Sequence, residues 1–135
     1  MQRTINTLTA AILLVAGMAV TGTAHAQNNC NTPGNNFEDV YCLVKVFVKA
    51  DDDLNVAYQK LLQRLTPSAQ GTLRRTQRAW VASRNADCTA NDSRQGSIIY
   101  IGCAVDRTTV RTNFLNDRYR ECISSGCQPS KLNDN

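Results

Sequence analysis

The sequence VYCLVKVFVKADDDLNVAYQKLLQRL occupies residues 40–65 and carries the clearest periodicity in the chain. Apolar side chains recur in it at alternating steps of four and three, the spacing that places side chains along one face of an α-helix. One carboxylate, that of Asp51, interrupts this apolar stripe. The stripe consists of Val40, Val44, Phe47, Asp51, Leu54, Tyr58, Leu61 and Leu65. We therefore predict a long first helix over residues 37–65.

Two further helices are predicted downstream. Thr66 followed by Pro67 is a helix-start signal, because threonine caps a helix N-terminus and proline suits the first turn. The second helix should cover residues 67–88 and the third residues 103–122. Between them, the apolar residues 98–101 fit either a short buried strand or a helical turn. The predicted fold class is all-α, a small domain of three helices, or of four if that turn is helical.

The N-terminus is typical of a cleavable signal peptide. An apolar run over residues 8–20 precedes Ala24, His25 and Ala26, and the two alanines are the small residues that signal peptidase requires. The run is too short to span a bilayer. We predict cleavage at about Ala26–Gln27, export to the periplasm or the exterior, and no stable membrane anchor.

The mature chain has the size of one domain. Removal of 26 of the 135 residues leaves 109, enough for one hydrophobic core. We expect an irregular lead-in over residues 27–36, a helical domain over residues 37–122, and a disulfide-tied polar tail over residues 123–135 that is loose from Gln128 onward. Loss of Arg3 lowers the net charge from +4 to +3, far from the charge of a nucleic-acid-binding domain.

All six cysteines lie in the predicted mature chain, at Cys30, Cys42, Cys88, Cys103, Cys122 and Cys127. An even number of thiols in an oxidising compartment is typical of a disulfide framework. Cys122 and Cys127 flank a short flexible loop, and Cys88 and Cys103 bracket the connection between the second and third helices. The first two cysteines then pair by elimination, although an exchange among the first four is equally compatible with the sequence.

The chain has one histidine, His25, which leaves with the predicted signal peptide. The mature chain therefore lacks the usual general base and the usual zinc ligand. The consecutive aspartates at residues 51–53 do not have the alternating ligand spacing of a calcium loop. We predict no enzyme activity, no catalytic residue, no bound metal and no cofactor.

Asp51 is expected to be buried, because it lies within the apolar stripe. A buried carboxylate needs an opposite charge, and Arg84 and Arg111 are the candidate partners, since a guanidinium can bind a carboxylate through two hydrogen bonds. A structural ion pair is favoured over a ligand-binding acid. Trp80, the only tryptophan, shares a helix face with Leu73, which favours core packing over a sugar-binding platform.

Four ordered blocks of sequence carry a family resemblance: Asp51, Leu54, Asn55 and Tyr58; Gln77, Trp80, Arg84 and Cys88; Gly96 and Ser97 before Cys103; and Thr108, Arg111 and Leu115. Together, over about residues 37–115, they resemble the lysozyme inhibitor LprI-like domain family of bacterial envelope proteins. The resemblance implies a small, secreted, all-helical module in which these positions are structural, and for some members inhibition of lysozyme. Asn85 departs from the family pattern, which commonly has an aspartate there, and the segment beyond residue 115 has no counterpart in it.

The same resemblance implies a protein partner, a lysozyme or another peptidoglycan hydrolase. Animal lysozymes are basic and the mature chain carries a charge of +3, so electrostatic steering would need a local acidic patch. Glu38, Asp39, Asp52 and Asp53 form the predicted patch if they share a face. We expect inhibition by protein–protein occlusion. The alternative is a non-catalytic envelope structural or stress protein that contacts cell-wall components.

Overall fold

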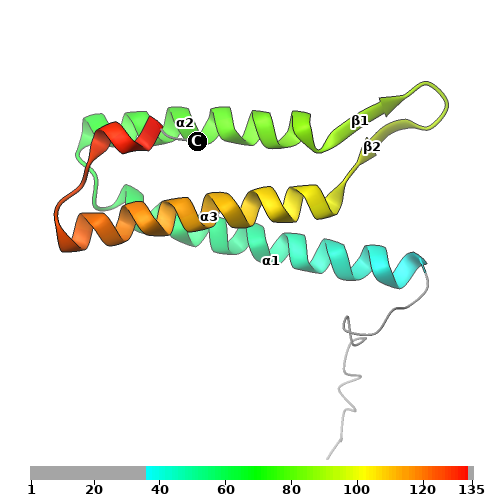
Figure 1. Ribbon diagram of the computed structural model, residues 1–135, viewed down its shortest axis with the longest axis horizontal. Helices are drawn as coiled ribbons and strands as arrows, with labels where there is room; N and C mark the ends of the chain where they lie inside the picture. The colour runs from blue at the N-terminus through cyan, green and yellow to red at the C-terminus, as the bar shows by residue number, and fades with distance from the viewer. Residues whose placement is uncertain (1–35, 134–135) are drawn as a thin grey trace, which may run out of the picture.

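The computed structural model describes residues 36–133, which form three helices and a hairpin (Figure 1). The elements are α1 (Asn36–Leu62), α2 (Pro67–Asp87), β1 (Thr89–Asp92), β2 (Gly96–Ile99), α3 (Ile101–Ser124) and a short 3-10 helix, η1 (Pro129–Asn133). The mostly helical architecture agrees with the all-α prediction, apart from the small two-stranded sheet. The predicted signal peptide, the lead-in up to residue 35, and Cys30 lie outside the described residues.

The three helices lie along a common direction. α1 and α3 run the same way and pack along each other, while α2 runs antiparallel to both (Figure 1). The core between them is formed by Leu54, Ala57, Leu61, Leu65, Ala69, Leu73, Trp80, Leu115 and Leu132. Each fully buried leucine contributes about 2 kcal/mol of hydrophobic stabilisation. The helices are therefore joined by one continuous apolar core.

The turn between α1 and α2 is tight. α1 ends at Leu62, three residues earlier than predicted, because Leu65 N–H donates to the Leu62 carbonyl at 3.3 Å in a narrower turn. Leu65 nevertheless keeps its predicted core position, with 6% of its surface exposed. The Thr66 hydroxyl accepts from Ala69 N–H at 3.4 Å, which confirms the predicted cap of α2.

The apolar stripe of α1 is buried only in its second half. Leu54 and Leu61 are 3% and 0% exposed, but Val40 and Val44 are 52% and 41% exposed. Figure 1 shows the reason: the first turns of α1 extend past the start of α3. Among the described residues no other helix lies over these turns.

The connection between α2 and α3 is an antiparallel hairpin, paired from Thr89↔Ile99 to Asp92↔Gly96. The predicted extended piece is confirmed for Ile98 and Ile99, but its predicted burial is wrong, because Ile98 is only half-buried and Ile99 is 67% exposed. The hairpin projects beyond the helix ends, where nothing in residues 36–133 covers it (Figure 1). α3 begins two residues before, and ends two residues after, its predicted limits.

The polar tail is not loose as predicted. Leu132, in η1, is 1% exposed and packs in the core against α2. Lys131 Nζ lies 2.7 Å from Glu121 Oε1 on α3. The disulfide between Cys122 and Cys127 returns the chain toward the bundle, so ordering the few residues that follow costs little chain entropy.

Two predicted disulfides are confirmed. Cys88 is bonded to Cys103 across the base of the hairpin, and Cys122 to Cys127 after α3. Cys42 is also disulfide-bonded, and its predicted partner lies outside the described residues. Within residues 36–133, no helix combines the length and the apolar character that a membrane span requires.

Candidate functional site

Six of the family-motif residues meet in an interhelical cluster between the three helices: Asp51, Gln77, Trp80, Arg84, Thr108 and Arg111. Arg84 Nη1 lies 3.3 Å from Asp51 Oδ1 on α1 and donates to Thr108 Oγ1 on α3 at 3.3 Å. Its guanidinium also covers the Trp80 ring at 5.1 Å from the centroid. One arginine on α2 therefore contacts both other helices.

The predicted arginine partner of Asp51 is confirmed, but the predicted burial of Asp51 is wrong. The Asp51 side chain is 44% exposed, whereas that of Arg84 is 12% exposed. The second carboxylate oxygen of Asp51 accepts from Asn55 Nδ2 one turn along α1 at 3.3 Å. Asp51 lies at the edge of the helix interface, so solvent reaches its carboxylate and screens the ion pair.

Arg111 is the deeply buried charge of the cluster, with 2% of its surface exposed. Its Nε donates to Gln77 Oε1 at 3.1 Å, and its guanidinium stacks over Phe114 at 4.6 Å from the ring centroid. Burial removes water from the guanidinium and lowers the pKa of Arg111 to about 10. Arg111 is charged at neutral pH, and the aromatic faces of Trp80 and Phe114 help to stabilise its buried guanidinium.

The interhelical cluster joins α1, α2 and α3 through contacts among its own side chains. Its α3 members are packed against the other helices, with Thr108 0% and Arg111 2% exposed. Among residues 36–133 no group of three or more histidine, cysteine or acidic side chains is placed to hold a metal ion. Exposed surface lies instead at the ends and on the outer faces of the bundle.

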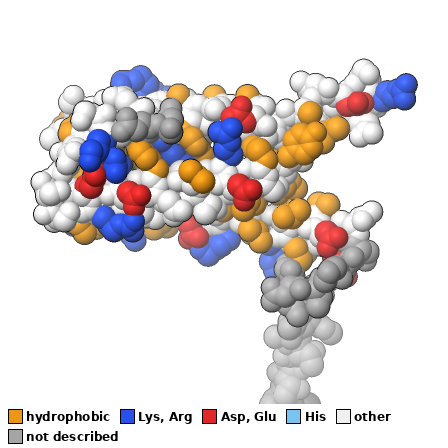
Figure 2. Space-filling view, viewed as in Figure 1, with side chains coloured by type: hydrophobic (Ala, Val, Ile, Leu, Met, Phe, Trp, Pro, Cys, Tyr) orange, Lys and Arg blue, Asp and Glu red, His pale blue; other side chains and the backbone are white. Residues whose placement is uncertain are grey.

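One end of the molecule, which we call the open end, consists of the β1–β2 hairpin, the start of α3 and the first turns of α1. Figure 2 shows the molecule hollowed there, with hydrophobic side chains along the hollow. Ile99 and Tyr100, at the hairpin side, are 67% and 51% exposed. In the first half of α1, the exposed apolar side chains are Phe37, Val40, Tyr41, Leu43, Val44, Val46 and Val48.

A groove of about 360 Å³ forms the floor of the open end. Its apolar lining comes from three elements: Phe47 on α1, Ile99 on β2, and Ile101 and Ala104 on α3. Asn85, where the family pattern has aspartate, lies at its α2 side. The groove is therefore apolar at its centre with a polar edge, the composition typical of a protein-binding surface.

The hairpin tip is ordered by its own side chains. The Asp92 carboxylate accepts from Arg94 N–H at 2.8 Å and from Gln95 N–H at 2.9 Å, and these two hydrogen bonds lower its pKa. Gly96 has a φ of +78°, the left-handed conformation that favours glycine. Across the strands, Ser97 Oγ donates to Asn91 Oδ1 at 2.9 Å. The family-motif residues Gly96 and Ser97 thus shape the hairpin.

Sequence reasoning missed this hairpin as a projecting element. Asp92 and Gly96 flank a three-residue turn, and β-branched Ile98 and Ile99 follow it, which together are a recognisable hairpin signal. That signal indicates a turn but not whether the strands are covered, and it does not single out Arg94.

The structure does not gather the predicted acidic patch into one surface. Glu38 and Asp52 are fourteen residues apart on α1, a separation of about 21 Å along the helix axis. Asp53 forms an ion pair with Lys49, one turn away. Only Glu38 and Asp39, in the first turn of α1, lie at the open end.

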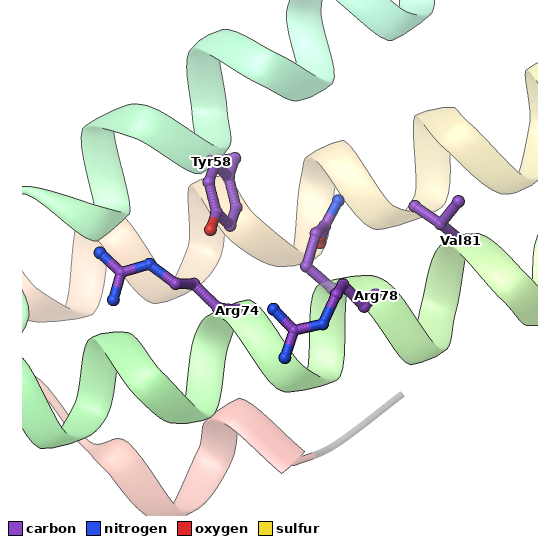
Figure 3. Close-up of a pocket in the computed structure, with 5 residues that line it drawn as sticks. Tyr58, Arg74, Arg78 and Val81 are labelled. Carbon is purple, nitrogen blue, oxygen red and sulfur yellow. The ribbon is translucent and has the colours of Figure 1, made fainter.

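A second groove, of about 350 Å³, lies between α1 and α2 on the side of the bundle. Figure 3 shows the Tyr58 ring projecting from α1 toward α2, beside Arg74 and Arg78. Within residues 36–133 neither guanidinium forms an ion pair, and α2 contains no acidic residue before Asp87. This basic groove is a candidate site for an anionic group.

Comparison with known proteins gives one match. The family model described as "Lysozyme inhibitor LprI" matches residues 26–115, which include α1, α2, the hairpin and the first part of α3. No curated protein and no solved structure matches the chain. The matched range ends before the second disulfide and η1, so these C-terminal features lie outside the family model.

Proposed function

We propose that this chain, which belongs to the lysozyme inhibitor LprI family, is an exported protein that inhibits a lysozyme-type hydrolase by binding over it, with no chemistry of its own. The observation that carries the proposal is the exposed apolar surface of the open end. Two rigid elements, the hairpin and α1, present it around the groove. Family membership supplies the class of partner.

The anatomy of the open end supports protein binding rather than catalysis. Protein interfaces combine an apolar centre, rich in aromatic side chains, with a polar rim. At the open end Ile99 and Tyr100 are available as apolar anchors. Glu38 and Asp39 lie at the α1 side and provide negative charge toward a basic partner.

The predicted export agrees with this function. Disulfides persist in oxidising compartments outside the cytoplasm, and the chain contains at least two within residues 36–133. Those compartments are also where peptidoglycan and its hydrolases meet. We therefore propose the periplasm or the exterior as the place of action, after cleavage at about Ala26–Gln27.

A lysozyme panel tests the proposal directly. The oxidised mature chain is titrated against lysozymes of several classes, and clearing of a peptidoglycan suspension is the readout. We expect inhibition of at least one class, weakened about tenfold or more by Ile99→Asp, because a charge would be desolvated in the interface. No inhibition of any lysozyme at micromolar concentration would reject the proposal.

The matched control is Val110→Asp. Val110 is as exposed as Ile99, at 69% against 67%, but it lies on α3 about 13 Å from the start of that helix. This variant should inhibit within about twofold of the parent protein. Equal losses in both variants would place the binding surface elsewhere.

The basic groove favours a second candidate, contact with an anionic cell-wall polymer. Arg74 and Arg78 lie one turn apart on α2 and can bind phosphate or carboxylate groups. Co-sedimentation with peptidoglycan carrying anionic polymers should fall with added salt and with Arg78→Glu, but not with Lys60→Glu. If co-sedimentation is unchanged by added salt and by Arg78→Glu, this candidate is rejected.

A further inference from the structure

We propose that Arg94, at the tip of the β1–β2 hairpin, is the side chain that enters the catalytic cleft of the target hydrolase and binds its catalytic carboxylates. This inference rests on the proposed function and adds to it the inhibitory contact. Figure 2 shows the hairpin as an arm projecting from the bundle, with a basic and an acidic side chain at its tip. The basic residue of the turn is Arg94, and the acidic one is Asp92.

The hairpin has the dimensions of an inserting arm. Each strand has four residues, so the tip lies about 13 Å from the strand bases. It is only two strands wide, and the side chains of the tip residues Ser93, Arg94 and Gln95 are exposed. A projection this narrow can enter a cleft that normally holds a polysaccharide chain.

The arm is held in shape at both ends. At its base the Cys88–Cys103 disulfide joins the end of α2 to the start of α3, and Tyr100 N–H donates to the Cys88 carbonyl at 2.9 Å. At its tip the Asp92 carboxylate accepts two backbone N–H groups. An arm fixed before binding loses little conformational entropy when it binds.

The charges at the tip are not equivalent. Asp92 directs Oδ1 back to the turn, where it is satisfied by Arg94 and Gln95 N–H. The guanidinium of Arg94 forms no ion pair within residues 36–133, and the side chain is exposed. The guanidinium of Arg94 is therefore exposed for contact with a partner, whereas the Asp92 carboxylate is hydrogen-bonded within the turn.

The chemistry of the partner matches this cation. Glycoside hydrolases that cleave glycans cut the bond with a pair of carboxyl groups in the cleft. A guanidinium binds carboxylates through paired hydrogen bonds, with a geometry that a lysine ammonium cannot reproduce. Arg94 in such a cleft would occupy the place of the substrate, pair with the ionised carboxylate and donate a hydrogen bond to the other catalytic carboxyl group. The apolar open end would then rest on the rim of the cleft.

The test is a double-mutant cycle with a lysozyme that the parent protein inhibits. Binding is measured by calorimetry for the parent and for Arg94→Ala, each against the native lysozyme and against one whose catalytic glutamate is changed to glutamine. We expect Arg94→Ala to weaken binding to native lysozyme about tenfold or more. The parent protein should bind the glutamine variant of lysozyme more weakly than it binds native lysozyme. Arg94→Ala should bind the two lysozymes with equal affinity.

Two further variants make the outcome specific. Arg94→Lys should bind with intermediate affinity, because charge is kept but the paired hydrogen bonds are lost. Arg75→Ala removes another exposed arginine, from α2, and should bind like the parent. Thermal unfolding of Arg94→Ala should match that of the parent, since Arg94 contributes only its backbone N–H to the turn.

Failure of this inference is distinct from failure of the proposed function. If the parent inhibits and Arg94→Ala inhibits equally well, Arg94 is not the inhibitory contact, while the proposed function stands. If the losses of binding free energy from Arg94→Ala and from the lysozyme substitution are additive, Arg94 does not contact the catalytic carboxylate, and the proposed function again stands. If the parent inhibits no lysozyme, the proposed function is rejected and the role of Arg94 is rejected with it.

Discussion

Arg84 and Arg111 show how the same residue type stabilises a helix interface in two different ways. Both guanidinium groups stack on the Trp80 ring, at 5.1 and 5.9 Å from its centroid. The Arg84 guanidinium forms an ion pair with the half-exposed carboxylate of Asp51. The Arg111 guanidinium is buried, and this burial lowers its pKa to about 10. Packing on the Trp80 face is therefore a stabilising contribution that the two arginines share.

Truncation of Arg84 tests this view. Arg84→Ala removes stacking on Phe47 and Trp80 and the hydrogen bond to Thr108. We expect the free energy of unfolding, measured with urea, to fall by about 2–3 kcal/mol. Asp51→Asn should cost less than about 1 kcal/mol, because its carboxylate is 44% exposed. Equal losses in the two variants would mean that the ion pair dominates.

Asp92 provides a pH-dependent prediction. Its pKa in the folded protein is lowered from 3.8, chiefly by the N–H of Arg94 and then by that of Gln95. The ionised carboxylate therefore stabilises the turn above pH 3.8, and this stabilisation is lost as pH falls through the lowered pKa. Amide exchange at Arg94 and Gln95 should quicken in that acidic window relative to β1 and β2.

The matched variant is Asp92→Asn. An asparagine oxygen still accepts the two N–H groups but does not titrate. Its hairpin should therefore lack the acid-dependent change in exchange. An NMR titration that places the Asp92 pKa at or above 3.8 would contradict the turn geometry.

At the scale of elements, the hairpin and η1 have opposite relations to the bundle. The hairpin leaves the bundle and satisfies its backbone internally, through four strand pairs. η1 returns to the bundle and adds Leu132 to the core. Each follows a disulfide-bonded cysteine, Cys88 or Cys127. A disulfide constrains the chain at the start of each segment. Whether the segment then packs on the bundle or projects from it depends on its own side chains.

Docking of η1 can be measured. Leu132→Ala removes a side chain that is 1% exposed, so the free energy of unfolding should fall by about 2–4 kcal/mol. Lys131→Ala, which breaks an ion pair at the surface, should cost less than about 1 kcal/mol. If Leu132→Ala leaves the free energy of unfolding unchanged, the tail contributes nothing to the stability of the core.

At the scale of the whole molecule, charge and contact surface act differently. The predicted mature chain has a net charge of +3, which repels a basic lysozyme at long range. Raising ionic strength from about 0.01 to about 0.15 M shortens the Debye length from about 30 to about 8 Å. We therefore expect the association rate constant with a basic lysozyme to rise over this range in stopped-flow or surface measurements.

The opposite salt dependence would also be informative. An association rate that falls with salt would show that Glu38 and Asp39 steer the encounter despite the net charge. Arg94→Ala should act mainly on the dissociation rate, because its contact forms only after docking. These two readouts separate long-range steering from the contact in the cleft.

The amino-acid sequence by itself determined the local features. Three helices, the Thr66 cap, two disulfides and the pairing of Asp51 with an arginine follow from periodicity, residue type and cysteine position. Such signals act over a few residues or through one strong chemical preference, so they can be recognised without knowing the rest of the fold. The match to the LprI family covers residues 26–115, which include the four sequence blocks that carry the resemblance.

Only the tertiary structure decided which surfaces are free. Val40 and Leu54 belong to one apolar stripe, yet one is 52% exposed and the other 3%, because α1 extends past the start of α3. Ile99 projects with the hairpin, while Leu132, in a polar tail, is buried. Burial of a side chain depends on where the neighbouring helices begin and end in space. The periodicity of one helix does not contain that information.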